Sequence, residues 1–225
     1  MVGFRVAHGA GSSWQEILSG ALAVLGPRRQ DENMGFLYAT DYLAPHLGEI
    51  LAGLRAETGI ADWIGTTGIG IGAQSEGGSP REYYDRPALA LMLGALPADS
   101  FRVFEPVHGG LGPFRDQNGA WLARTHPLLG MVHADPRNPL SPSILEELSE
   151  ATGSFLVGGF TSSRGGSFPQ VASGVVEGGI SGGFFAGKLA VATGLTQGCS
   201  PIGPAHEVTE AEDNIVKALD GRPAF

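Results

Sequence analysis

The sequence has one cysteine, Cys199, so no disulfide can form within the chain. It has no unbroken apolar run of about 18 residues, the length that a membrane-spanning helix needs, and residues 1–11 lack the basic flank and apolar stretch of a signal peptide. Charged residues make up only 16%, and the net charge of −9 would repel a polyanion. We therefore expect a cytoplasmic protein that binds neither membranes nor nucleic acid.

Turn-forming residues are plentiful instead. The 225 residues include 36 glycines and 15 prolines, and 42% of the chain is hydrophobic. That apolar share is too high for a disordered chain, and the glycines lack the period of collagen. The composition predicts a globular, loop-rich protein with a packed core.

An internal repeat is present. A shift of 94 positions aligns segments 41–72 and 135–166 with ten identities, against about two expected from average composition. We assign the repeat to residues 34–96 and 129–193. The identical pairs are Asp41/Asp135, Pro45/Pro139, Ile50/Ile144, Leu51/Leu145, Leu54/Leu148, Thr58/Thr152, Gly59/Gly153, Gly65/Gly159, Thr67/Thr161 and Gly72/Gly166.

In each copy the sequence pattern predicts a strand, a helix, a second strand and a hairpin. The runs 35–41 and 130–135 are typical of buried strands that end at the shared aspartate. Gly59 and Gly153 stand where left-handed helix ends are expected, and Ser143 and Glu146 have the spacing of a capping box. Second strands are expected at 63–65 and 155–159, followed by strand-like runs at 88–96 and 180–193.

Two more segments complete the predicted fold. A strand near 4–8 and a helix near 13–25, capped by Ser12 or Ser13, precede the first copy as an extra unit. Residues 97–127, with scattered prolines and glycines, are expected to connect the copies. Two such units would cover each other's open sheet faces. The predicted fold class is α/β, a layered α/β sandwich of two pseudo-symmetric strand-helix-strand-hairpin units.

The loops that follow the second strands carry the candidate ligand site. Their hydroxyl groups and one guanidinium suit a carboxylate or a phosphate. The alternative is that these residues only form Ser/Thr turns at the strand ends. The candidate ligand-binding residues are Thr66, Thr67, Thr161, Ser162, Ser163 and Arg164.

Catalytic and metal signals are weaker. Residues 179–183 match G-x-S-x-G around Ser181, but a strand-like run follows where a nucleophile elbow needs a helix. His133 and Asp135 lie two residues apart and could share a metal, yet two ligands do not make a site. We therefore predict no catalytic residue and no cofactor.

The C-terminal part resembles a known family. Residues 197–204 read Q-G-C-S-P-I-G-P and residues 219–224 read L-D-G-R-P-A. This resembles the FIST family (F-box and intracellular signal transduction proteins), whose N-terminal domain carries Q-G-C-R-P-I-G-P and then L-D-G-R-P-A; Ser200 replaces the arginine. The order of elements over 34–166 is similar as well. The resemblance implies that residues 1–225 form a FIST N-terminal-like sensory domain, with 194–225 starting the link to a C-terminal domain.

The resemblance also implies a function. We expect a non-enzymatic sensory domain that binds a small molecule such as an amino acid and acts on a signalling partner such as a histidine kinase. Gln197 and Cys199 join the candidate ligand-binding residues, because the glycines and prolines around them predict a rigid loop that forms either a binding wall or a buried corner.

Three alternatives stay open. One is a nitric oxide sensor that holds haem b non-covalently, with His133 as axial ligand. Another is a protein-interaction scaffold without a small ligand. The last is a hydrolase that uses Ser181 or Cys199.

Overall fold

The computed structural model describes residues 3–194 and 200–225. The chain divides into two compact units, Met1–Ala190 and Val191–Phe225.

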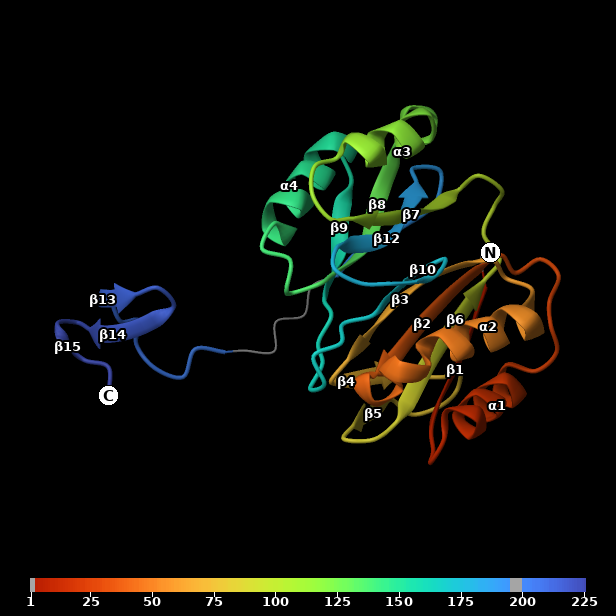
Figure 1. Cartoon of the computed structure of the whole chain (residues 1–225), viewed down its shortest axis with the longest axis horizontal. Helices are drawn as coiled ribbons and strands as arrows, with labels where there is room; N and C mark the ends of the chain where they lie inside the picture. The colour runs from red at the N-terminus through yellow and green to blue at the C-terminus, as the bar shows by residue number, and fades with distance from the viewer. Residues whose placement is uncertain (1–2, 195–199) are drawn as a thin grey trace. The chain divides into compact units, whose positions relative to one another are not determined.

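The first unit is built from two halves that follow each other in the chain (Figure 1). The first half contains β1 (Phe4–Ala10), α1 (Trp14–Leu25), β2 (Met34–Thr40), a 3-10 helix (Asp41–His46), α2 (Leu47–Thr58), β3 (Asp62–Gly68), β4 (Gly70–Ala73), β5 (Arg81–Tyr84) and β6 (Ala88–Gly94). The second half contains β7 (Phe101–Val107), α3 (Gly112–Thr125), β8 (Pro127–Ala134), α4 (Ser141–Thr152), β9 (Phe155–Phe160), β10 (Gln170–Ala172), β11 (Val175–Val176) and β12 (Ile180–Ala186).

The two halves share one sheet topology. The first sheet has the order β1-β6-β2-β3-β10-β11 and the second has the order β7-β12-β8-β9. In each half the two strands joined by the helical crossover, β2 with β3 and β8 with β9, pair in parallel, and the other pairings are antiparallel. The predicted layered α/β fold is therefore confirmed.

Three apolar clusters separate four layers. Helices α1 and α2 cover the outer face of the first sheet, and α3 and α4 cover the outer face of the second, as Figure 1 shows. The third cluster fills the space between the two sheets. Its buried residues are Met34, Phe36, Ile64, Leu96, Leu129 and Phe185.

Residues 97–127 are not the connection that we predicted. They contain β7 and α3, which take the places in the second half that β1 and α1 take in the first. Pro106 is tolerated because β7 is an edge strand, and Pro113 lies in the first turn of α3, where a missing N–H costs nothing. The strand and helix before residue 34 are thus part of the repeat and not an extra unit.

The helix ends match the prediction better than the helix starts. The Ser13 side chain caps α1 by accepting the Glu16 N–H, and α2 and α4 end at the left-handed Gly59 and Gly153. The capping box at Ser143 is wrong, because α4 already begins at Ser141. Asn138 Oδ1 accepts the Leu140 N–H ahead of this start.

The gapless alignment of the repeat is correct in the helices and slips by one residue in the strands. Leu37 lies opposite Gly65 and Val132 lies opposite Gly158, and both glycines have positive φ, 158° and 140°. This equivalence makes Thr40, and not Asp41, the counterpart of Asp135. It also makes Tyr38 the counterpart of His133.

The second unit is a three-stranded sheet of β13 (Val208–Glu212), β14 (Ile215–Leu219) and β15 (Arg222–Pro223). The L-D-G-R-P-A stretch forms the turn between β14 and β15, where Asp220 and Gly221 both have positive φ. A consecutive pair of such residues is what a tight two-residue hairpin needs.

The equivalent glycines generate a test of the fold. A Cβ at Gly158 would lie 1.8 Å from Val132 O, whereas a Cβ at Gly159 meets nothing within 4 Å. We expect Gly158→Ala to lower the free energy of unfolding by about 3 kcal/mol, because both the clash and the positive φ must be relieved. The control Gly159→Ala should change it by less than about 1 kcal/mol. Urea unfolding of both variants measures the difference, and equal values would contradict this account of the strand pairing.

Candidate functional site

The candidate residues gather where the carboxyl ends of β2, β3, β8 and β9 meet. Thr66 and Thr67 lie within β3 itself, and Thr161 directly follows β9. The hydroxyl oxygens of Thr66 and Thr161 are 2.6 Å apart. The structure therefore brings the two predicted segments together, one from each half, and we call this place the rim.

Two other hydroxyls serve the backbone. Thr67 is buried, and its hydroxyl donates to Pro169 O at 3.3 Å. Ser163 Oγ accepts the Gly165 N–H at 3.1 Å, which is the local turn considered as the alternative. Ser162 instead joins the halves, because its Oγ accepts the Ile69 N–H at 3.0 Å.

Arg164 is held by two carboxylates of the first half. Its Nη1 donates to Asp41 Oδ1 at 2.9 Å, and its backbone N–H donates to Asp41 Oδ2 at 2.6 Å. Its Nη2 donates to Asp85 Oδ1 at 2.8 Å. The Asp41 side chain is 5% exposed and that of Asp85 is 79% exposed. The exposed Asp85 is the partner that an incoming anion could replace on this guanidinium, whereas Asp41 is buried.

Tyr38 and His133 face each other across the two sheets. Tyr38 Oη lies 3.1 Å from His133 Nε2, and the ring centroids are 5.5 Å apart. Burial raises the pKa of Tyr38 to about 12 and lowers the pKa of His133 to about 4. Both side chains are therefore neutral at pH 7.

His133 does not fit the role of axial haem ligand in this arrangement. Its side chain is buried, its Nε2 is taken up by Tyr38, and its Nδ1 is enclosed without a hydrogen-bond partner. An iron atom could approach either nitrogen only if the two sheets separated, which would expose the apolar cluster between them. His133 and Asp135 also have separate partners, so the pair does not form a shared metal site.

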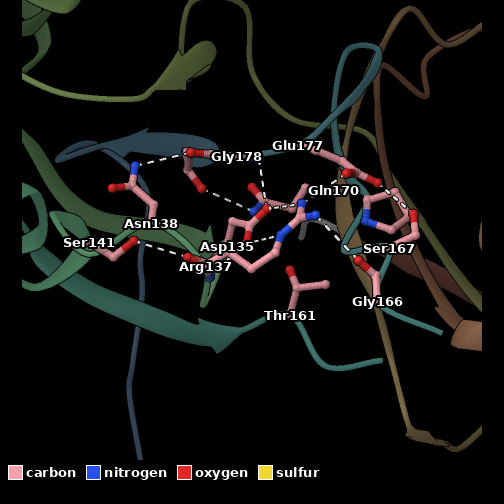
Figure 2. A network of polar contacts seen from close by, with 12 residues as sticks. Asp135, Arg137, Asn138, Ser141, Thr161, Gly166, Ser167, Gln170, Glu177 and Gly178 are labelled. Atoms are coloured by element: carbon pink, nitrogen blue, oxygen red, sulfur yellow. Dashed lines mark hydrogen bonds and ion pairs between the residues drawn. The ribbon is translucent and has the colours of Figure 1, made fainter. Parts of the chain in front are cut away.

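Asp135 is the centre of a polar network that sequence reasoning did not anticipate (Figure 2). The fully buried carboxylate accepts bonds from Arg137 Nη2 at 2.6 Å and from the Gly178 N–H at 2.8 Å. Arg137 also donates to Glu177 Oε2 at 2.9 Å, and Ser167 donates to the other oxygen of Glu177. The Arg137 guanidinium holds the pKa of Asp135 below its usual range.

The network fastens the segment before β12 to the end of β8. Its counterpart in the first half is Thr40, whose hydroxyl donates to Arg86 O at 2.8 Å and accepts the Ala88 N–H at 3.0 Å. Both residues thus tie the end of the first parallel strand of a half, β2 or β8, to the segment that leads into its last strand, β6 or β12. We read the Asp135 network as part of the scaffold of the rim.

Ser181 makes a polar contact from the second sheet to the first. It is fully buried in β12, and its hydroxyl donates to Gln170 Oε1. Gln170 Nε2 in turn donates to Gly179 O at 3.1 Å. The G-x-S-x-G pattern is therefore embedded in a strand, and it does not form the sharp strand-to-helix turn that exposes a nucleophile.

Part of the prediction has no structural outcome. Gln197 and Cys199 lie outside the described residues. Within residues 3–194 and 200–225, no group of three or more His, Cys, Asp or Glu side chains is arranged to hold a metal ion. In the same part of the chain, no helix combines the length and the apolarity that crossing a bilayer requires.

The residues that the sequence did not reveal are the partners of the predicted ones. Asp41, Asp85 and Tyr38 contact Arg164 or His133 across 79 to 123 positions of the chain. Asp41 carried one signal, its identity with Asp135 in the shifted alignment. That signal was misleading, because the two aspartates are not equivalent in the structure.

The chain was compared with known proteins. The model of the FIST family described as the FIST N domain matches residues 33–222, which is nearly the whole chain. No curated protein matches the sequence.

The buried histidine makes stability depend on pH. An unfolded chain protonates its histidines near pH 6.5, but the folded chain protonates His133 only near its pKa of about 4. The free energy of unfolding should therefore fall as the pH drops from about 6.5 to about 4, by about 3 kcal/mol from this residue. His133→Gln should flatten that fall in urea unfolding, and replacing the exposed His46 with Gln should not. An unchanged slope in His133→Gln would contradict the assignment.

Proposed function

Because the chain belongs to the FIST family, we propose that it is the sensory domain of a signal-transduction protein, and that it binds a small zwitterion such as an amino acid at the rim. FIST domains are generally sensory domains of signalling proteins. The ligand and its position are our proposal.

The observation that carries the proposal is the ion cluster of Arg164, Asp41 and Asp85. It combines a cation with two carboxylates, of which Asp41 is buried and Asp85 is exposed. A ligand carboxylate can replace Asp85 on the guanidinium, and the released Asp85 can then pair with the ligand ammonium. Both charges of an amino acid would be matched without leaving a protein charge unpaired.

The cluster also joins the two halves, which is what a sensor needs. Arg164 belongs to the loop after β9, whereas Asp41 follows β2 and Asp85 lies between β5 and β6. Replacing Asp85 would change a contact between the halves, and a change in their contact can bias a conformational equilibrium that a partner such as a histidine kinase reads.

A non-enzymatic role is supported by the state of the candidate nucleophile. Ser181 is buried, and its hydroxyl donates a hydrogen bond to the side-chain amide of Gln170. An amide cannot act as a general base. His133 lies beside it in the sheet register, but its Nε2 contacts Tyr38.

The proposal can be tested by examining the two charges of the ligand separately. We would screen the standard L-amino acids by thermal shift and then measure the affinity of each hit and of the carboxylic acid that lacks its amino group. Asp85→Asn should weaken the amino acid about tenfold, because the ammonium loses its partner, and should leave the plain acid unchanged or tighter.

Two arginine variants complete the design. Arg164→Ala should weaken both compounds by about tenfold or more, while Arg124→Ala should weaken neither. Arg124, on α3, is a matched control because it also forms an exposed ion pair, with Asp99. If no L-amino acid stabilises the protein, or if Asp85→Asn weakens both compounds equally, the ligand class is wrong.

A further inference from the structure

The two halves differ at one edge of their sheets. In the first sheet β10 pairs with the outer edge of β3, although β10 belongs to the second half. The equivalent edge of β9 carries no strand among residues 3–194 and 200–225. The edge of β3 is therefore covered by a strand, whereas the equivalent edge of β9 is open within the described residues.

The covered edge is filled by an extended, antiparallel strand. Val171 lies opposite Gly65, is fully buried and packs in the cluster between the sheet and α2. The Thr67 N–H donates to Pro169 O at 3.2 Å, and the Ser173 N–H donates to Trp63 O at 2.7 Å. Arg55 of α2 donates to Ser173 O from the helix side.

The backbone groups of β9 that correspond to those of β3 face the open edge. Gly158 is the counterpart of Gly65, so Phe160 corresponds to Thr67, whose N–H bonds to the added strand. The N–H of the next residue, Thr161, donates toward β8, to Ala134 O at 2.9 Å. Because N–H groups alternate in direction along a strand, the Phe160 N–H points to the open edge. The phenyl groups of Phe155 and Phe160 are 61% and 55% exposed.

In the second half, a groove lies at the position that corresponds to Val171 in the first sheet. It has a volume of about 510 Å³ and runs between β9 and α4. Its lining is mostly apolar and includes Val132, Leu145, Leu156, Gly158 and Phe160. This is enough room for the apolar side chain of a strand that pairs with β9.

We propose that β9 accepts an extended segment of a partner protein as an additional antiparallel strand, with an apolar residue opposite Gly158 entering the groove beside α4 and a basic residue two positions away on the same face. This mode of recognition uses main-chain bonds for affinity and alternate side chains for specificity. It does not depend on the ligand at Arg164.

The charges of α4 select the partner. Glu146 lines the groove, and Glu147 and Glu150 lie on the same helix. The counterpart of the cationic Arg55, which donates to Ser173 O just after β10, is the neutral Ser149. A second copy of this chain would bring its own α4 glutamates toward these, and like charges oppose that pairing. A segment with lysine or arginine two positions from its apolar residue, and therefore on the same face, complements them.

Two synthetic peptides test the proposal on the whole chain. One has the sequence Lys-Thr-Val-Thr-Val-Thr-Lys, and its twin has glutamate in place of both lysines. Fluorescence anisotropy should show that the basic peptide binds about tenfold tighter than the acidic one. Hydrogen exchange should show that the basic peptide slows exchange of the Gly158 and Phe160 amides.

A matched pair of variants locates the contact. Glu146→Lys should reverse the preference between the two peptides, whereas the neighbouring Glu147→Lys should leave it in place, since Glu147 does not line the groove. Light scattering should show that the chain forms no dimer and that Glu146→Lys does not induce one.

Four results would overturn the proposal. They are absence of binding by either peptide, equal binding of both, equal effects of Glu146→Lys and Glu147→Lys, and a dimer formed through β9, which would make a second copy the occupant. None of these outcomes affects the Arg164 site, so a failure here can be told apart from a failure of the proposed ligand.

Discussion

The packing of one sheet on the other is the interaction on which the remaining structure depends. Each half covers the outer face of its sheet with two helices but leaves the inner face apolar, so neither half can exclude water from its sheet alone. Met34 and Phe36 of β2 meet Leu129 of β8 and Phe185 of β12 in the shared cluster. Farther along β2 and β8 the contact changes from apolar to polar at Tyr38 and His133, and this change places the rim where both halves contribute strand ends.

The sequence predicted the repeat because the helices of both copies keep one spacing and end at equivalent glycines. It did not predict the strand equivalence, because the parallel pairing joins Met34 to Asp62 in one half and Leu129 to Phe155 in the other, which are connections of unequal length. It also missed β7 and α3. Proline and glycine are turn signals in general, but an edge strand and a first helical turn tolerate proline because neither needs its N–H.

The candidate site was predictable in its hydroxyls and not in its charges. Thr66 and Thr161 lie at the two strand ends where the repeat predicted hydroxyl-rich loops, and the structure puts their hydroxyls in contact. The environment of Arg164 does not follow from any local pattern, because its partners Asp41 and Asp85 come from the other half. An arginine that sequence reasoning treats as a free anion site is thus an arginine already paired with two carboxylates.

The crossing of β10 from the second half to β3 has a consequence for how the chain folds. Val171 and Gly65 pair across more than a hundred residues, so the entropy of closing a long loop opposes this contact until most of the first unit has formed. A nascent chain that has emerged only as far as β6 exposes the edge of β3 together with its apolar inner face. Such an unpaired edge is a template for pairing with other chains. Synthesis of the second half is therefore the interval in which the edge of β3 is most open to aggregation.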